Sequence, residues 1–419
     1  MIEIRKPIEV AEAVKRVMKH SKIGEVETID FHDCDNRRLA EPIVAEHNIP
    51  TFDKSPYDGF ALRSQDTEQA SEDNPVELQV IEHIGAGELP TKVLKAGEAT
   101  RIMTGAKIPE GADCVAMFEV CEALDDEETR ISVAERFERG QNIIVEGSEV
   151  TEGEVLINEG TYINPGVKAL LATFGYAKVK VAKKPVVGVV ATGTELLDVD
   201  EPLEDGKIRN SNAYMIGAQV ERAGGIYRDL GKLADEFDPS YDKVKSALEE
   251  VDLLITTGGV SVGDFDLMPA IFEKLGAKIL FNKIAMRPGS VTTVATIEDK
   301  YIFGLSGNPS ACYVGFELFA RPVMNKLLFS DKPYLQRITA YLGEDYPKPN
   351  PFTRFVRSSI TIKNGKPTVT LAGMDKSNAV SSLAHTNCLM VLQGGTGGYV
   401  VDSEVDVLLI ESYEGQDNF

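Results

Sequence analysis

The sequence predicts a multidomain protein of the α/β plus β class, and three observations lead to this fold class. Between residues 185 and 330, short apolar runs alternate with helical patterns, which is typical of a parallel sheet with crossover helices. Residues 46–140 instead show short alternating runs separated by Gly and Pro, which predicts a β-rich unit. After residue 330 the helical pattern stops, and Asn364-Gly365 predicts a hairpin in a C-terminal β domain.

The first 45 residues and the segment 141–184 are less regular. An amphipathic helix is expected over Pro7–Met18, with Val10, Val14 and Val17 on one face. The later segment mixes turn glycines with an apolar helical stretch at 167–174. We therefore predict one discontinuous mixed subdomain, 1–45 and 141–184, into which the β-rich subdomain 46–140 is inserted. An α/β subdomain at 185–330 and a C-terminal β subdomain at 331–419 complete the division.

The α/β elements can be placed in order from their periodicity. Strands are expected at 186–190, 226–230, 253–256, 278–281, 291–295 and 301–305, and helices at 212–223, 239–250, 267–275 and 309–327. Alternation of this kind predicts a parallel sheet whose strands end on a common edge.

Composition excludes several classes of protein. The chain has 419 residues and a formal net charge of −22, which argues against electrostatic binding to nucleic acid. No apolar run approaches the roughly 20 residues that span a bilayer, and the N-terminus does not read as a signal peptide, so we expect a cytoplasmic protein without a membrane partner. The cysteines form no C-x-x-C pair, which disfavours a zinc site and a disulfide framework. Residues 110–159 carry 15 acidic and 3 basic residues, which predicts a solvated acidic face.

Three loops at the predicted strand ends are candidates for phosphate binding. The loops are ATGTEL (191–196), TTGGVSVGDFD (256–266) and LSGNP (305–309), and their backbone-binding candidates are Gly258, Gly259, Ser261, Gly307, Asn308 and Pro309. Asn308 suits the N-cap of the next helix and Pro309 its first turn, which would leave helical N–H groups for an anion. Any one loop could be a plain connection. Three on one sheet edge predict a phosphate-binding cleft.

Carboxylates near the same edge suggest a metal. Glu195, Asp235 and Asp266 are each predicted at or near strand ends, and Mg²⁺ usually takes one or two carboxylates together with substrate phosphates. For Asp235 the alternative is strong, because acids ahead of a helix are explained by capping. Arg287, in RPGS, either clamps an oxyanion or makes a surface ion pair.

Two polar clusters of the β-rich stretch are ordinary turns on propensity alone. They are SPYDGFALR (55–63), which contains Asp58, and RIMTGAKIPEGAD (101–113), which contains Thr104.

Taken in order and at these separations, SPYDGFALR, RIMTGAKIPEGAD, ATGTEL, TTGGVSVGDFD, RPGS and LSGNP resemble the molybdopterin molybdotransferase family, which includes the E domain of gephyrin. The resemblance covers nearly the whole chain. It implies an enzyme of molybdenum-cofactor synthesis that takes adenylylated molybdopterin and molybdate, releases AMP with the help of Mg²⁺, and leaves molybdenum on the dithiolene. It also implies an elongated homodimer with four subdomains per chain.

The resemblance assigns roles to individual residues. Functional positions of the family fall on Asp58, Thr104, Glu195, Asp235 and Asp266, the last three as metal ligands. A second anion pocket for molybdate is expected from Arg287 and Ser290, with Arg357 and Ser377 as oxyanion contacts of the C-terminal domain. Arg287 and Ser290 stand where the family often has lysine, and Ser306 stands where it commonly has proline.

The resemblance places the active site where the α/β domain of one subunit faces the C-terminal domain of the other. On this arrangement a homodimer is expected, because a monomer would not bring Arg357 and Ser377 to the α/β cleft. Proteins that make or accept the cofactor are possible further partners. The alternatives are an adenylyltransferase that activates molybdopterin, which the α/β domain alone resembles, and a dimeric scaffold like the E domain of gephyrin.

Overall fold

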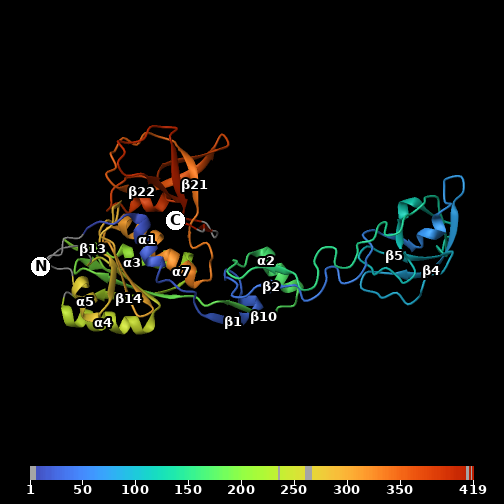
Figure 1. Cartoon of the computed structure of the whole chain (residues 1–419), viewed down its shortest axis with the longest axis horizontal. Helices are drawn as coiled ribbons and strands as arrows, with labels where there is room; N and C mark the ends of the chain where they lie inside the picture. Colours follow the sequence, from blue (N-terminus) through green and yellow to red (C-terminus); the bar gives the residue numbers. More distant parts are fainter. Residues whose placement is uncertain (1–5, 235, 260–266, 412–414, 417) are drawn as a thin grey trace. The chain divides into compact units, whose positions relative to one another are not determined.

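The computed structural model describes residues 6–234, 236–259, 267–411, 415–416 and 418–419. The chain divides into two compact units, which Figure 1 colours along the sequence. The first unit comprises Met1–Glu41, Glu159–Ala169 and Tyr176–Phe419, and the second comprises Pro42–Asn158 and Leu170–Gly175. Among the described residues, no helix has the length and apolar character needed to cross a membrane.

A mixed sheet forms the centre of the α/β part of the first unit. Its strands lie in the order β14 (Ile226–Leu233), β11 (Val186–Thr192), β15 (Leu253–Thr257), β19 (Lys300–Leu305), β18 (Thr293–Ile297), β16 (Lys278–Phe281). Strands β14, β11, β15 and β19 pair in parallel, as predicted, whereas β18 runs antiparallel to both of its neighbours. The prediction of a wholly parallel sheet is therefore wrong at β18. Only Glu298 and Asp299 separate β18 from β19, which is too short for a crossover and suits a hairpin.

Helices cover both faces of this sheet. Helices α4 (Phe237–Glu250) and α5 (Met268–Leu275) pack on one face, in a core that includes Val190 and Leu254. The other face carries Val189 and Ile255 and packs against α1 (Val10–Met18), α3 (Ser211–Arg222) and α6 (Pro309–Gly315). Alternate residues of β11 and β15 thus point into two separate cores, as the period of a strand requires.

The predicted helix over 309–327 is present but interrupted. After α6 comes a π-helical turn, Phe316–Ala320, and then α7 (Arg321–Leu327). Pro322 has no N–H with which to continue the helical ladder across this junction. The buried Glu317 carboxylate lies in the turn and binds Arg321, with Oε2 2.8 Å from Nη1.

The C-terminal part of the same unit is a barrel. Its strands follow the order β17 (Met286–Arg287), β22 (Thr353–Lys363), β23 (Lys366–Leu371), β21 (Arg337–Leu342), β25 (Glu404–Leu409), β24 (Cys388–Leu392), and β22 pairs again with β24. That second pairing closes the sheet. The predicted hairpin is confirmed, because Asn364 and Gly365 connect β22 to β23 with φ angles of 49° and 77°.

Strand β17 comes from the α/β segment of the chain but belongs to the C-terminal sheet. It pairs in parallel with β22, so that Met286 lies opposite Thr353 and Arg287 opposite Arg354.

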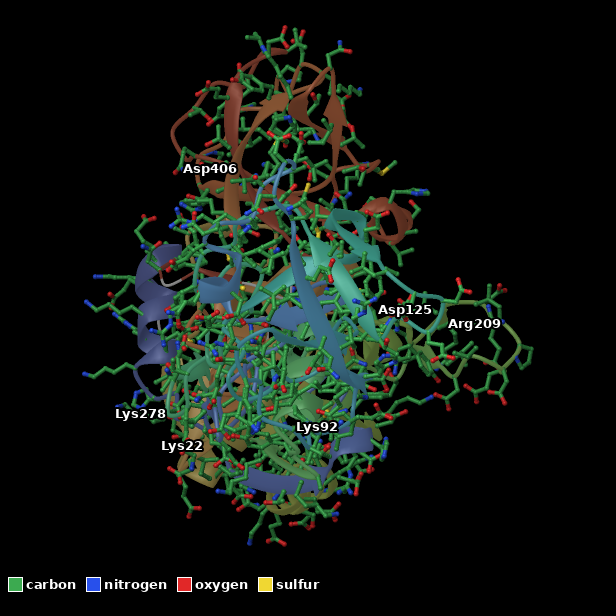
Figure 2. All side chains as sticks on the ribbon, turned by 90° about the vertical axis from the view of Figure 1, so that its right-hand side faces the viewer. Lys22, Lys92, Asp125, Arg209, Lys278 and Asp406 are labelled. Carbon is green, nitrogen blue, oxygen red and sulfur yellow. The ribbon has the colours of Figure 1, made fainter. Side chains whose placement is uncertain are left out.

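The first unit also contains two short strand pairs: β12 (Leu196–Leu197) with β13 (Ile208–Arg209), and β20 (Tyr334–Leu335) with β26 (Gly415–Gln416). In Figure 2, the labelled Asp406 marks β25 and Arg209 marks the end of β13.

Antiparallel pairs connect residues from the two halves of the predicted mixed subdomain. β1 (Val26–Asp30) pairs with β10 (Lys178–Ala182), and β2 (Ile43–Val44) pairs with β9 (Val155–Ile157). Helix α2 spans Pro165–Thr173. Four short 3-10 turns lie at Phe31–Asp33, Ser64–Thr67, Phe118–Val120 and Ser381–His385. Helix α1 packs with the α/β core instead, and the four-part division of the chain stays a prediction.

The second unit contains a sheet of its own, built from strands between residues 59 and 133. The order is β6 (Cys114–Met117), β3 (Gly59–Leu62), β5 (Glu98–Ile102), β4 (Val76–Ile84), β8 (Arg130–Val133), β7 (Cys121–Ala123). Phe60, Leu78 and Ile131 belong to its core. The acidic residues 126–127 at the turn between β7 and β8 are exposed beside Asp125, which Figure 2 labels. All five cysteines of the chain are free thiols.

Candidate active site

The described parts of the three predicted strand-end loops, 191–196, 256–259 and 305–309, meet at the carboxyl ends of β11, β15 and β19. They enclose a cavity of about 570 Å³, here called the glycine cavity, whose lining includes Thr192, Glu195, Gly258, Gly259 and Gly307. The Gly258 N–H donates to the carbonyl of Leu305 at 2.8 Å, which fixes two of the loops to each other. Parallel strands place their ends on one edge, so the convergence follows from the topology.

Two of these glycines are required by their surroundings. Gly258 and Gly259 have φ angles of 102° and 67°, a region that other residues rarely adopt. A Cβ on Gly258 would lie 2.6 Å from the Thr192 hydroxyl, and one on Gly259 would lie 3.0 Å from it. The loops approach each other closely only because both side chains are absent.

Glu195 is the candidate metal ligand that the structure describes. Its side chain is exposed at the glycine cavity and folds back over Gly193, where a Cβ would lie 2.4 Å from Oε2. Asp235, Ser261 and Asp266 lie outside the described residues. Within the described part of the chain, no group of three or more His, Cys, Asp or Glu residues could hold a metal ion. One free carboxylate beside backbone of this kind nevertheless fits Mg²⁺, which needs few protein ligands.

A second cavity of about 500 Å³ lies beside α6 and is here called the arginine cavity. It brings together Arg287, Ser290, Asn308, Arg357 and Ser377 of the predicted set. Loop 306–308 lies between the two cavities, because Gly307 lines the first while Ser306 and Asn308 line the second. Arg287 is exposed and makes no ion pair within the described residues, so the alternative of a surface ion pair is not realised there.

The arginine cavity corrects the expectation about subunits. Arg357 and Ser377 come from the C-terminal part of the same chain that supplies Arg287 and Ser290. A monomer therefore does bring these side chains to the α/β edge, and the argument for a dimer from their position is wrong. Strand β17 is the physical reason, because its pairing with β22 holds the two parts of the chain together.

Arg357 is more deeply buried than an exposed oxyanion contact would be. Its Nη2 donates to the carbonyls of Met374 and Lys376 at 3.0 and 3.1 Å, and Nε donates to Ser382 at 3.3 Å. Burial lowers the pKa of Arg357, and the nearby Asp375 charge opposes that effect. Nη1 makes no hydrogen bond in the described structure, but it lies 3.7 Å from Asp375 Oδ1 and so pairs with that carboxylate.

The N-terminus of α6 is less open than predicted. Asn308 is the N-cap residue and Pro309 opens the helix, but the Asn308 side chain makes no capping hydrogen bond. The Ser310 N–H donates instead to the Ser377 carbonyl at 3.0 Å, and the Ser310 hydroxyl donates to Ala379 at 2.6 Å. The C-terminal segment thus takes up a donor that we expected to be free for an anion. Sequence periodicity could not show this contact, because it joins residues about 70 positions apart.

In the second unit, Asp58 and Thr104 contact each other. Asp58 Oδ1 accepts from the Thr104 backbone N–H at 2.7 Å and from its hydroxyl at 2.9 Å. These hydrogen bonds, the backbone one first, lower the pKa of Asp58 and favour the carboxylate. The interpretation of two separate turns is therefore incomplete, because the Asp58 side chain joins the loop before β3 to the loop after β5.

Three residues of the arginine cavity region were missed from the sequence. Arg354 and Asp375 line the cavity, and Tyr346 donates its hydroxyl proton to Asp375 Oδ2 at 2.6 Å. Arg354 in TRFVR was the available signal, since a charged residue within an apolar strand needs a partner. Nothing in the local sequence identified that partner as Asp375.

Comparisons with known proteins cover the whole chain. The MoeA N-terminal region (domain I and II) matches residues 8–175, a probable molybdopterin binding domain matches 188–326, and the MoeA C-terminal region (domain IV) matches 339–410. A molybdopterin molybdenumtransferase of Bacillus subtilis (strain 168) is 55% identical over 100% of this chain and 97% of its own length. One from Staphylococcus aureus (strain MSSA476) is 50% identical over 98% of both chains.

Solved structures agree with the sequence matches. A molybdopterin biosynthesis moeA protein from Pyrococcus horikoshii OT3 superimposes with a TM-score of 0.82 at 31% identity, covering 96% of this chain and 100% of that chain. Another structure, of a molybdopterin biosynthesis moea protein from Pyrococcus horikosii, gives a TM-score of 0.85 at 27% identity and covers 97% and 100%. The match to the Bacillus subtilis protein extends over the full length of this chain. The chain therefore belongs to the molybdopterin molybdenumtransferase family.

Proposed function

We propose that this transferase of molybdenum-cofactor biosynthesis inserts molybdenum from molybdate into adenylylated molybdopterin and releases AMP with the help of Mg²⁺. The observation that carries the proposal is the pair of cavities on the two sides of loop 306–308. One is built for close approach of backbone to a ligand, and the other is lined by guanidinium groups. A phosphorylated pterin and a separate oxyanion would need such a pair.

The glycine cavity is the proposed site for the phosphates of the pterin nucleotide. Backbone at Gly258, Gly259 and Gly307 lets phosphate oxygens approach without obstruction by side chains. Glu195, together with Asp235 and Asp266, is the proposed ligand set for Mg²⁺. When bound, Mg²⁺ would neutralise charge on the phosphate that leaves during cleavage of the pyrophosphate bond.

The arginine cavity is the proposed site for molybdate. Molybdate is a tetrahedral dianion, and planar guanidinium groups match two of its oxygens at a time. We assign Arg287, Ser290, Asn308, Arg357 and Ser377 to this site.

Asp58 and Thr104 are proposed to take part in metal binding or proton transfer, which the family resemblance supports. The lowered pKa of Asp58 favours the metal role, because it keeps the carboxyl group ionised.

One assay tests the proposal against its alternatives. Purified protein is mixed with adenylylated molybdopterin, molybdate and Mg²⁺, and AMP is measured over time. AMP that appears only with all three components supports the proposal. Conversion of unmodified molybdopterin and ATP to the adenylylated form would instead show an adenylyltransferase, and no turnover in either assay would leave a scaffold.

We further propose a cytoplasmic homodimer that exchanges its cofactor with other synthesis or acceptor proteins. Support for the dimer now comes from the family resemblance alone. Light scattering at micromolar concentration tests it, because the chain has a mass of 45.7 kDa and a dimer twice that. A monomer mass would reject the dimer and leave the single-chain arginine cavity unaffected.

A further inference from the structure

The arginine cavity carries more positive charge than the proposed molybdate contacts supply. Its described lining includes the guanidinium groups of Arg287, Arg354 and Arg357, with Asp375 as the carboxylate among them. The chain as a whole has a net charge of −22, so a cationic cavity is a local feature rather than a reflection of composition. Three guanidinium groups around one carboxylate leave an excess of positive charge for a ligand to neutralise.

Two of these cations lie directly beside each other. Arg287 on β17 and Arg354 on β22 are register partners in a parallel pair, and their side chains line the same cavity. Like charges on adjacent strands repel. Because Arg287 makes no ion pair within the described residues, an anion in the cavity would relieve this repulsion.

Arg354 is held in position by an ion pair with Asp375 and a hydrogen bond to Asn350. Its Nη1 lies 3.0 Å from Asp375 Oδ2, and its Nε donates to Asn350 Oδ1 at 3.0 Å. The Arg354 side chain is 13% exposed and the Asp375 side chain 4%. Within the described residues no hydrogen bond involves Nη2 of Arg354. One edge of the guanidinium is thus fixed to the protein while the remaining nitrogen is available to the cavity.

We propose that Arg354 is a further anion-binding residue of the arginine cavity, which pairs with Arg287 across β17 and β22 to hold a tetrahedral oxyanion. This inference rests on the proposed function for the identity of that anion as molybdate. The two side chains come from strands whose backbones are hydrogen-bonded, so their separation is set by the sheet and not by a flexible loop.

The test measures molybdate binding to the full-length protein by titration calorimetry at low salt, without pterin. Arg354→Gln should weaken binding at least tenfold, because it removes one charged contact to a dianion. Lys348→Gln is the matched control. Lys348 also binds Asp375 Oδ2, at 3.3 Å, but its side chain is 51% exposed and does not line the cavity. The control should change affinity less than twofold.

A second pair of variants separates binding from folding. Arg354→Lys keeps a cation beside Asp375 but loses the planar fork, and it should bind molybdate several-fold more weakly at an unchanged melting temperature. Ser290→Lys in the Arg354→Gln background returns a cation to the cavity and should regain part of the affinity. The salt dependence of binding should also be smaller in Arg354→Gln than in the original protein.

The possible results discriminate between this inference and the function on which it rests. Molybdate binding that is unchanged in both Arg354→Gln and Arg354→Lys would overturn the inference and leave the proposed function standing. Equal loss in Lys348→Gln and Arg354→Gln would also overturn it, because the effect would then act through Asp375. If the original protein bound no molybdate and released no AMP, the proposed function itself would fail.

Discussion

The glycine cavity and the arginine cavity share one loop, yet they are built by opposite means. The first is lined by glycine-rich loops at the ends of β11, β15 and β19 and by the apolar side chains of Leu233, Leu267 and Met268. It depends on the absence of Cβ atoms at Gly258 and Gly259. The second is walled by charged side chains from β17, β22 and the segment near Asp375. We therefore expect the glycine cavity to be sensitive to added side-chain bulk and the arginine cavity to be sensitive to lost charge.

The largest effect is expected at Glu195, the charged residue that lines the glycine cavity. Glu195→Ala should lower AMP release at ordinary Mg²⁺ by roughly a hundredfold or more, if Glu195 is a metal ligand. The melting temperature should hardly change, because the side chain is exposed. Glu204→Ala, which removes another exposed carboxylate between β12 and β13, serves as the control. Full activity in Glu195→Ala would place the metal elsewhere.

Asp58→Asn tests whether the second unit also contains a residue whose charge is needed for turnover. An Asn Oδ1 can still accept both hydrogen bonds from Thr104, so folding should be unaffected. Turnover should nevertheless fall by about a hundredfold if the carboxylate binds metal or transfers a proton. Steady-state AMP release and a melting curve on the same variant decide the question. Unchanged turnover would mean that Asp58 only joins two loops.

Gly258→Ala tests the sensitivity of the glycine cavity to bulk. The added Cβ would lie 2.6 Å from the Thr192 hydroxyl, on a residue whose φ of 102° already disfavours a side chain. We expect a loss of about 1–3 kcal/mol in stability and roughly tenfold in turnover. Gly206→Ala is the matched control, because Gly206 has a φ of 76° but nothing within 4 Å of its Cβ position. Similar turnover in the two variants would contradict a role for close approach.

The smallest effect concerns the charge network behind the arginine cavity. Burial alone would raise the pKa of Asp375, but the Tyr346 hydrogen bond and the charges of Arg354, Lys348 and Arg357 together lower it. A lowered native pKa stabilises the fold above the ordinary carboxyl value near 4, and this stability is lost as the pH falls through the native value. Thermal unfolding should therefore depend on pH below about 5.

Asp375→Asn should flatten that dependence, because an amide does not titrate in this pH range. Asp299→Asn is a suitable comparison, because Asp299 is 78% exposed and pairs with Lys22 at the surface. A pH profile of Asp375→Asn that matched the original protein would show that the network contributes no measurable stability.

Sequence reasoning succeeded where a site is made by backbone. Glycines after apolar strands can be recognised locally, and the parallel topology then brings Glu195, Gly258 and Gly307 together. It failed at β18, whose direction is set by the two-residue turn to β19 rather than by the overall alternation of elements. It also failed at the α6 N-terminus, which is closed by the Ser377 carbonyl, far away in the sequence.

The arginine cavity shows the same limit at the level of charge. Arg287 was recognised from its motif, but Arg354 was not, because its importance depends on register with β17 and on the position of Asp375. The joining of Asp58 to Thr104 was likewise invisible in the local pattern, since either residue alone suits a turn. Long-range pairing, rather than local propensity, determines the contacts of Arg354, Asp58 and Thr104.

The pairing of β17 with β22 also limits how the gene can be divided. A fragment that ended at residue 330 would keep β17 but lose the strand whose backbone it pairs with, and a fragment that began at 331 would lack that edge of its barrel. Neither piece would retain a complete arginine cavity, because its lining comes from both sides of the cut. The boundary that composition suggests is therefore a poor place for a fusion joint or an expression truncation.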